Sequence, residues 1–203
     1  MKVIIDGENL RHQIADVLVK NNKILPKDKN KYFKFDLRDF LEDILSEPEL
    51  DINYYATKVK QPKHKIPKKL VDRIQMISQS NRQWIAKITN DKIWVIKAGY
   101  LRVRESSSCT HCGKKTLVLQ EKGVDVRVAT DIVLESQGNP GTSLAVACSD
   151  SDIVPALQAA NSLGGKIIYI CYSGRLNRSI AAIADKVVTY DDPSVLRFFE
   201  ATK

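Results

Sequence analysis

The sequence predicts an α/β protein with a mostly parallel central sheet and helices on both of its faces. Three β-branched residues in a row, Val3 to Ile5, are typical of a strand that is buried on both sides. From residue 143 onward, strand-like and helix-like segments alternate and are separated by short turns, a pattern that favours parallel strands joined by helices. The 203 residues, 43% of them hydrophobic, are enough for one domain with a sizeable core.

The individual elements follow from local patterns. Strands are predicted from β-branched and aromatic runs, and helices from apolar residues that recur every three or four positions. In chain order, these patterns predict a strand at 3–5, helices at 10–18 and 35–45, a strand at 52–59, a helix at 70–84, strands at 93–104 and 116–120, a helix from 124, a strand at 143–148, a helix at 152–163, a strand at 166–171, a helix at 177–184, a strand at 186–188 and a helix at 193–200. In the helix from 124, the predicted apolar side is Val126, Val128, Ala129, Ile132, Val133 and Leu134.

One domain is predicted to span residues 1–203. The strands at 93–104 and 116–120 flank a polar turn, so residues 93–120 are predicted to form a β-hairpin arm inserted into this domain. The chain begins directly with a strand and contains neither a secretory signal nor an apolar run of membrane-spanning length. We therefore expect a cytoplasmic protein without a membrane partner.

The net charge of +8 is concentrated in two lysine-rich loops, at about 20–34 and 58–69. Such loops suit contacts with the phosphates of a nucleic acid, although a solubilising surface explains the charge equally well. Trp84, Trp94 and Tyr100 offer rings for base stacking, but core packing is the better interpretation of each. The candidate nucleic-acid contacts in the second loop are Lys58, Lys60, Lys63, Lys65, Lys68 and Lys69.

Carboxylates follow two of the predicted buried strands. Asp6 ends the first strand, and Asp150 follows the strand at 143–148, so both should lie at the carboxyl edge of the sheet, where ligands bind in open α/β folds. Asp125 and Asp152 stand at or near the starts of helices and could join them at this edge. Aspartates that hold Mg²⁺ or Mn²⁺ can activate a water and neutralise the charge that develops when a phosphodiester is cleaved. Asp125 and Asp152 are also well placed to cap helices, and Asp6 could cap the first helix; for any single aspartate, capping is the more common role.

Three short blocks carry a resemblance to a known family. They are Val-Ile-Ile-Asp-Gly-Glu-Asn at 3–9, Lys-Gly-Val-Asp-Val-Arg-Val-Ala-Thr-Asp at 122–131 and Cys-Ser-Asp-Ser-Asp-Ile at 148–153. In this order they resemble the signature blocks of the NYN domain family, part of the PIN-like nuclease superfamily, with the closest likeness to its bacterial LabA-like branch. The resemblance extends over residues 3–190. Any single block is weak, but three in the family's order are specific.

The resemblance implies a Rossmann-like, three-layer PIN-type fold and a metal-dependent ribonuclease that acts on single-stranded or structured RNA with Mg²⁺ or Mn²⁺. Position by position, it implies that the catalytic residues are Asp6, Asn9, Asp125, Asp150 and Asp152, with Asp6, Asp125 and Asp150 as metal ligands. Asp131 and Ser149 are expected to stand behind these residues rather than to touch the ion. Asn9 is expected to orient a water or a phosphate through its amide.

Two other functions remain open on the sequence. The first is a nucleic-acid-binding regulatory module that keeps the fold without turnover. The second is a phosphatase-like or nucleotide-binding enzyme that uses the same acidic edge. A glycine-rich phosphate loop of the Walker type is absent from the sequence, which counts against nucleotide hydrolysis.

A pair of cysteines, Cys109 and Cys112, stands in the turn of the predicted hairpin. A structural zinc site normally has four ligands, and no second Cys-x-x-Cys pair exists in the chain. The missing pair favours a plain reduced turn. The alternative is a zinc half-site completed by a second subunit of a homodimer or by a distant histidine.

Overall fold

The computed structural model of the protein describes residues 1–60, 62 and 65–200. Of the predicted lysine contacts, Lys63 lies outside these residues. The main sheet has seven strands in the order β5-β4-β3-β1-β6-β7-β8, and a separate two-stranded sheet pairs β2 with β9. The strands are β1 (Lys2–Asp6), β2 (Lys34–Phe35), β3 (Asp51–Val59), β4 (Trp94–Glu105), β5 (Leu117–Lys122), β6 (Ser143–Ala147), β7 (Lys166–Tyr172), β8 (Lys186–Tyr190) and β9 (Phe199–Glu200). The helices are α1 (Gly7–Lys20), α2 (Leu37–Leu45), α3 (Lys68–Asn90), α4 (Val124–Gly138), α5 (Val154–Ser162), α6 (Arg178–Ala181) and α7 (Asp192–Arg197).

Strand β1 lies at the centre of the main sheet. It pairs in parallel with β3 on one side and with β6 on the other, and β4, β7 and β8 continue the parallel arrangement. The edge strand β5 runs antiparallel to β4. The observed sheet confirms the predicted mostly parallel architecture, and it brings the carboxyl ends of the parallel strands to one edge.

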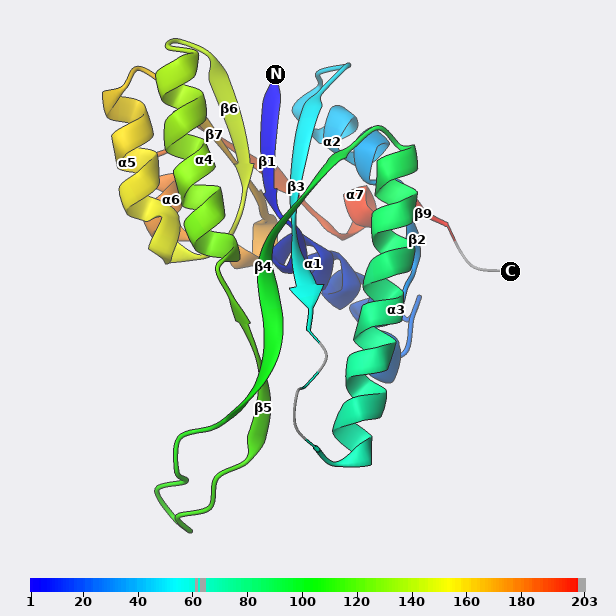
Figure 1. Ribbon diagram of the computed structural model, residues 1–203. Helices are drawn as coiled ribbons and strands as arrows, with labels where there is room; N and C mark the ends of the chain where they lie inside the picture. The colour runs from blue at the N-terminus through cyan, green and yellow to red at the C-terminus, as the bar shows by residue number, and fades with distance from the viewer. Residues whose placement is uncertain (61, 63–64, 201–203) are drawn as a thin grey trace.

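Helices cover both faces of the sheet, which gives the predicted three layers (Figure 1). Val3 and Ile5 point into a core formed with α1, α2, α3 and α7. Ile4, between them, points into a second core formed with α4, α5 and α6. Since successive side chains of a strand point to opposite faces, the buried middle of a central strand must be apolar at every position, as Val3, Ile4 and Ile5 are.

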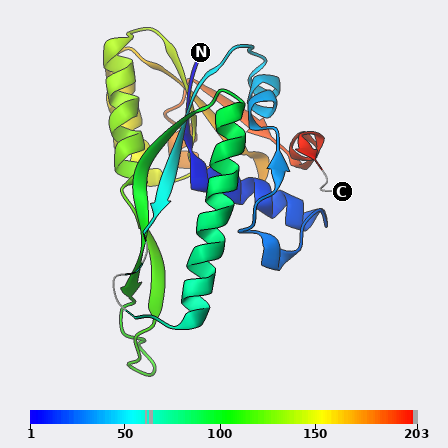
Figure 2. The ribbon, with the colours of Figure 1, turned by 45° about the vertical axis from the view of Figure 1, so that its right-hand side comes forward.

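The region predicted to be an inserted arm belongs partly to the main sheet. The first part of β4 pairs with β3, from Asn53 opposite Trp94 to Val59 opposite Leu101. Only the part of β4 from Tyr100 onward pairs with β5. The turn between these two strands extends away from the rest of the molecule, as both ribbon views show (Figures 1 and 2).

Three predictions about side-chain burial were wrong. Val126 and Leu134 are 71% and 56% exposed, because α4 buries a narrower stripe formed by Val124, Val128, Ile132 and Ser136. Trp94 is 70% exposed at the start of β4. Trp84, by contrast, is buried in the core as predicted.

Gly7 is required by the close approach of α1 to β3. A Cβ atom at this position would lie 2.3 Å from Cε1 of Tyr54 and 2.6 Å from the backbone oxygen of Tyr55. The Tyr54 hydroxyl also donates a hydrogen bond of 2.8 Å to the Gly7 carbonyl, so the ring has little freedom to move away. The approach fixes the start of α1, directly after Asp6, against the sheet.

We expect Gly7→Ala to destabilise the protein by about 1–3 kcal/mol, the usual cost of overpacking a close contact. The measurement is the free energy of unfolding from urea titrations of both proteins. Gly138→Ala is the matched control, since a Cβ there meets nothing within 4 Å. A Gly7→Ala protein as stable as the control would show that α1 can move away from β3 without cost.

Candidate active site at the carboxyl edge of the sheet

The site lies where the order of the strands reverses. The strands that follow β1 in the chain lie on one side of it, beginning with β3, and those from β6 onward lie on the other side. The crevice at such a reversal, beyond the carboxyl ends of the strands, is where open α/β folds bind their ligands. Asp6 is the last residue of β1, and Ser149 and Asp150 follow β6 closely. The predicted meeting of these two chain segments at one edge is confirmed.

Asp6 is a buried carboxylate, only 7% exposed. One of its oxygens accepts a hydrogen bond of 3.1 Å from the backbone N–H of Asn9, so Asp6 caps α1, and the thiol of Cys148 lies 3.8 Å from the other oxygen. Burial raises the pKa of Asp6 to about 7, and the carboxylates of Glu121, Asp125 and Glu8 contribute to the increase. At neutral pH this group therefore favours either a proton or a cation.

Asp125 and Asp150 lie near the buried thiol of Cys148, which also borders Asp6, and Asp152 lies near Asp125. Asp125 lies in the first turn of α4, where burial raises its pKa and the charges of Asp150 and Asp152 raise it further. One oxygen of Asp150 accepts a hydrogen bond of 2.9 Å from the backbone N–H of Asp152, which caps the short 3₁₀ helix Ser151–Ile153. Asp150, and not Asp152, is therefore the capping residue. At the start of α4 the cap position belongs to Gly123, so Asp125 has no capping role.

Two further carboxylates at this edge were not predicted. Glu121 lies on β5 opposite Leu101, and burial raises its pKa together with the charges of Glu8 and Asp125, against the opposing effect of the Thr57 hydroxyl. Glu8 stands in the first turn of α1, within the first sequence block. The position of Glu8 within that block could have identified it as a site residue from the sequence. No comparable sequence signal existed for Glu121, because its position depends on the register in which β5 pairs with β4.

The aspartates do not form a ready-made cage for an ion. Within residues 1–60, 62 and 65–200, no three His, Cys, Asp or Glu side chains come together closely enough to hold a metal. The donors at the edge are nevertheless carboxylate oxygens, the type that Mg²⁺ and Mn²⁺ prefer. Mg²⁺ keeps several of its waters and is usually held by one or two carboxylates together with substrate phosphates, so the donor set fits such an ion without a preformed triad.

Asn9 and Ser149 belong to a hydrogen-bond network that joins α1 to the loop after β6. The side-chain oxygen of Asn9 accepts hydrogen bonds from the Ser149 hydroxyl (2.9 Å) and the Gln13 amide (2.7 Å). Tyr190 donates to the side-chain oxygen of Gln13 (2.8 Å), and the Asn177 amide donates to the backbone oxygen of Ser149 (3.0 Å). Gln13, Tyr190 and Asn177 were not predicted. The network fixes the loop that carries Asp150 relative to Asp6.

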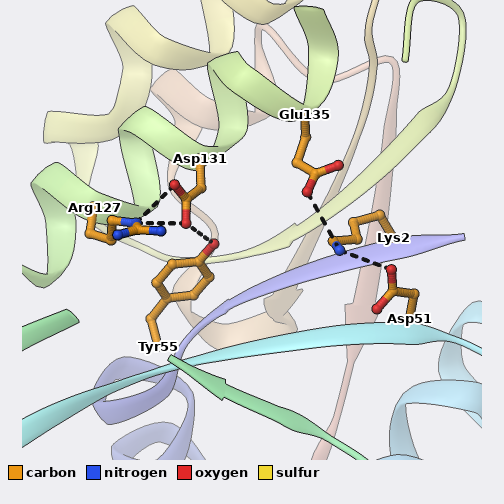
Figure 3. Close-up of polar contacts among 6 residues, drawn as sticks. All are labelled: Lys2, Asp51, Tyr55, Arg127, Asp131 and Glu135. Carbon is orange, nitrogen blue, oxygen red and sulfur yellow. Dashed lines mark hydrogen bonds and ion pairs between the residues drawn. The ribbon is translucent and has the colours of Figure 1, made fainter. Parts of the chain in front are cut away.

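Asp131 connects α4 to the sheet through a hydrogen bond with Tyr55 of β3. The Tyr55 hydroxyl donates to one of its oxygens at 2.7 Å, and the Arg127 guanidinium approaches both oxygens at 2.8 and 2.9 Å (Figure 3). Tyr55 lies beside Asp6 in the pairing of β3 with β1. Asp131 thus holds the helix that carries Asp125, which agrees with a supporting position.

An ion-pair network makes a second connection between α4 and the sheet, farther along the same helix. The Lys2 ammonium bridges Asp51, at 2.8 Å, and Glu135 of α4, at 3.5 Å (Figure 3). Lys2 and Asp51 are the first residues of β1 and β3, so this bridge lies at the opposite end of these strands from Asp6.

Two adjoining pockets lie between α3 and the sheet, next to the acidic edge. The first, of about 250 Å³, is lined by Glu8 and Glu121 among others, and the second has a volume of about 480 Å³. They share Thr57 and Asn81 as lining residues. We call this pair of pockets the α3 groove. Its cationic lining residues are Arg11, Lys58, Arg73, Arg82 and Lys97.

Arg11 is the buried cation of the α3 groove, only 5% exposed. Its guanidinium donates to the side-chain oxygen of Asn81 at 2.6 Å and to the Ser80 hydroxyl, and it lies 5.6 Å from the centre of the Trp84 ring. Its Nε atom has no hydrogen-bond partner among the described residues. The groove therefore keeps a fixed positive charge close to the acidic edge.

The other predicted contact residues are spread over two regions. Lys58, at the end of β3, lines the α3 groove, and the Lys60 ammonium lies 3.8 Å from the centre of the Tyr100 ring. Lys65, Lys68 and Lys69 are exposed before and at the start of α3. Cys109 and Cys112 are free and exposed in the turn between β4 and β5.

Comparisons with known proteins agree with this architecture. One solved structure of similar fold is a protein of unknown function from Vibrio parahaemolyticus, which is 13% identical, with a TM-score of 0.55 over 94% of this chain and 92% of that chain. No protein with a curated description matches the sequence. In the part of the chain that the structure describes, no helix is both long enough and apolar enough to cross a membrane. The model of the NYN domain matches residues 1–191, so the chain belongs to the NYN domain family and has the PIN-like nuclease fold of that family.

Proposed function

We propose that the protein is a metal-dependent ribonuclease whose catalytic centre is the acidic edge around Asp6. The observation that supports this most strongly is a buried carboxylate at the reversal point of the sheet, with a pKa raised to about 7 by burial and by neighbouring carboxylates. Such a cluster gains stability when a divalent cation supplies the missing positive charge. Membership of a family with a nuclease fold points the same cluster toward phosphodiester hydrolysis.

The candidate ligands for Mg²⁺ or Mn²⁺ are Asp6, Asp125 and Asp150, of which one or two would hold the ion together with phosphates of the substrate. A bound ion would stabilise the charge on the scissile phosphate and make a water more acidic. Asp152 and Glu121, at the border of this set, can accept hydrogen bonds from water and so orient it for attack. Asn9 acts through the loop that it holds, because its side-chain oxygen is already engaged by Ser149 and Gln13.

The α3 groove provides a path for the substrate to the acidic edge. Its cationic side chains can contact phosphates without reading bases, as lysine and arginine do in sequence-independent binding. The first pocket reaches the edge at Glu8 and Glu121, so a single strand in the groove would bring its phosphates toward Asp6. The fixed charge of Arg11 lies beside this path.

The test is cleavage of an end-labelled RNA and of the DNA of the same sequence, with Mn²⁺, with Mg²⁺ and with EDTA. We expect cleavage of the RNA with either ion, none with EDTA, and a loss of at least about 100-fold in Asp150→Asn, typical of removing a group that stabilises transition-state charge. Asp51→Asn is the matched control, since it makes the same change of charge at the opposite end of the strands. Full activity in Asp150→Asn would place the catalytic centre elsewhere.

The same experiment separates the ribonuclease from a regulatory module without turnover. Such a module would retain the RNA, measured by fluorescence anisotropy, yet leave it intact with every ion. Preferential cleavage of the DNA would support the assigned acidic centre but would show that the substrate is DNA and not RNA.

A further inference from the structure

The turn between β4 and β5 carries two thiols at the end of a projecting arm. All residues from 107 to 117 are exposed, and the arm extends beyond the other elements in both ribbon views (Figures 1 and 2). Cys109 and Cys112 are both free. The acidic edge does not use them, and the strands of the arm do not need them for pairing. Two exposed free cysteines in one turn call for an explanation by reactivity or by metal binding.

The turn has a defined conformation around Cys109. The backbone N–H of Gly113 donates to the carbonyl oxygen of Cys109 at 2.8 Å, and the N–H of Cys109 donates to the carbonyl oxygen of Lys114 at 2.9 Å. The backbone N–H groups of His111 and Cys112 are directed at the Cys109 sulfur, and together with the Cys112 thiol they lower the pKa of Cys109. The turn therefore holds the two thiols next to each other, as two ligands of one ion must be.

The two thiols are only half of a zinc site. Structural zinc is held tetrahedrally by four ligands, most often with cysteines at this spacing. His111 lies between the thiols in sequence, but its ring contacts the Thr110 hydroxyl at 3.2 Å, and no third His, Cys, Asp or Glu joins the pair within the described residues. The one histidine or cysteine outside them is His64, which would bring a single-chain site to three ligands at most.

We infer that one Zn²⁺ is bound between the arm tips of two copies of this chain, with Cys109 and Cys112 of each copy as its four ligands. A two-fold axis through the ion makes the contact self-complementary, as in most homodimers. The exposed position of the turn leaves room for the second arm. Four thiolates and one Zn²⁺ carry a net charge of −2. Lys114 and Lys115 of both copies follow Cys112 within three positions in the sequence and supply positive charge to this turn, although the Lys115 ammonium also lies 3.5 Å from Glu105.

The test uses the full chain without a histidine tag, purified under reducing conditions. Elemental analysis is expected to give one zinc per two chains, and native mass spectrometry a dimer that contains one zinc. A chelator should convert this dimer to zinc-free monomers, and added Zn²⁺ should restore it with saturation at one ion per two chains. Because this readout uses wild-type protein, it does not depend on whether a cysteine variant folds.

Variants then identify the ligands. Cys109→Ser and Cys112→Ser should each lose the zinc and the dimer, while Ser108→Ala and His64→Ala, the controls, should keep both. Co²⁺ in place of zinc should give the visible spectrum of a tetrahedral tetrathiolate. Any of three results would overturn the inference: one zinc per monomer, protein free of zinc after purification with zinc supplied, or a dimer that survives in the serine variants. RNA cleavage is not part of this test, so its outcome is independent of the proposed nuclease activity.

Discussion

Replacing Asp6 by asparagine is expected to abolish RNA cleavage and, in the same protein, to stabilise the metal-free fold above pH 7. The variant lacks a proposed metal ligand, so we expect cleavage with Mn²⁺ to fall by at least about 100-fold. An asparagine oxygen can still accept the hydrogen bond from the backbone N–H of Asn9 and cap α1. The loss of cleavage would therefore occur without a loss of structure.

The sign of the stability effect follows from the raised pKa of Asp6, about 7 in the fold against an ordinary value of 3.8. Below about pH 4 both the folded and the unfolded chain carry the proton, and the wild type has no penalty. Between about pH 4 and 7 the unfolded chain loses the proton first, so the stability of the wild type falls as pH rises and is lowest above pH 7. The difference between 7 and 3.8 corresponds to an upper limit of about 4 kcal/mol.

The measurement is the melting temperature of wild type and Asp6→Asn between pH 4 and 9 in EDTA. The gap between the two proteins should open as pH rises to 7 and then stay constant, and Mn²⁺ should raise the melting temperature of the wild type only. Asp192→Asn is the control, and in this case the variant should be less stable than the wild type. The reason is that Lys20, Tyr172 and Asn21 favour the charged form of Asp192 and lower its pKa to about 2. A constant gap from pH 4 to 9 would show that Asp6 does not titrate as the buried acid described above.

Removing two cations of the α3 groove is expected to weaken RNA binding and to flatten its dependence on salt. Arg82 and Lys97 are exposed and line the second pocket, so alanine at both positions should leave the fold intact. If each contacts one phosphate, the slope of log affinity against log salt should fall by about 1.4, since one contact to a single strand accounts for about 0.7. The loss should be similar for every RNA sequence, because phosphate contacts do not read bases.

Fluorescence anisotropy at 50 to 200 mM salt measures this slope. The matched control is Lys166→Ala/Lys186→Ala, which removes the same charge from the starts of β7 and β8, at the opposite edge of the sheet. An equal change in both double variants would mean that net charge, and not the groove, sets the affinity. Alanine at Lys65, Lys68 and Lys69 tests the predicted basic loop in the same way.

Much of the candidate site could be predicted because it depends on local patterns at strand ends. Asp6 and Asp150 follow apolar runs that can only be central strands, and parallel strands place such residues at one edge. Glu121 escaped prediction because a hairpin can align its strands in several registers. The observed pairing of Leu101 with Glu121 is what brings this carboxylate to Asp6.

Errors in helices and caps have a similar origin in packing that the sequence does not specify. Val126 and Leu134 fit a broad apolar face, but α4 lies on the sheet along one narrow row and leaves both residues in solvent. Asp152 fits a helix cap as well as Asp150 does, and only the backbone geometry after β6 decides between them. Gln13 looks like an ordinary helix residue until the last strand of the main sheet places Tyr190 against it.

The hydrogen bond between Gln13 and Tyr190 determines when, during synthesis of the chain, the acidic edge can be completed. These residues are 177 positions apart, and the network that they complete holds the loop of Asp150 against α1. During translation the ribosome must release almost the whole domain before this contact can form, since contacts of such sequence separation arise late in folding. A nascent chain would therefore lack an assembled acidic edge until Tyr190 has left the ribosome, and the proposed nuclease activity would begin only after that point.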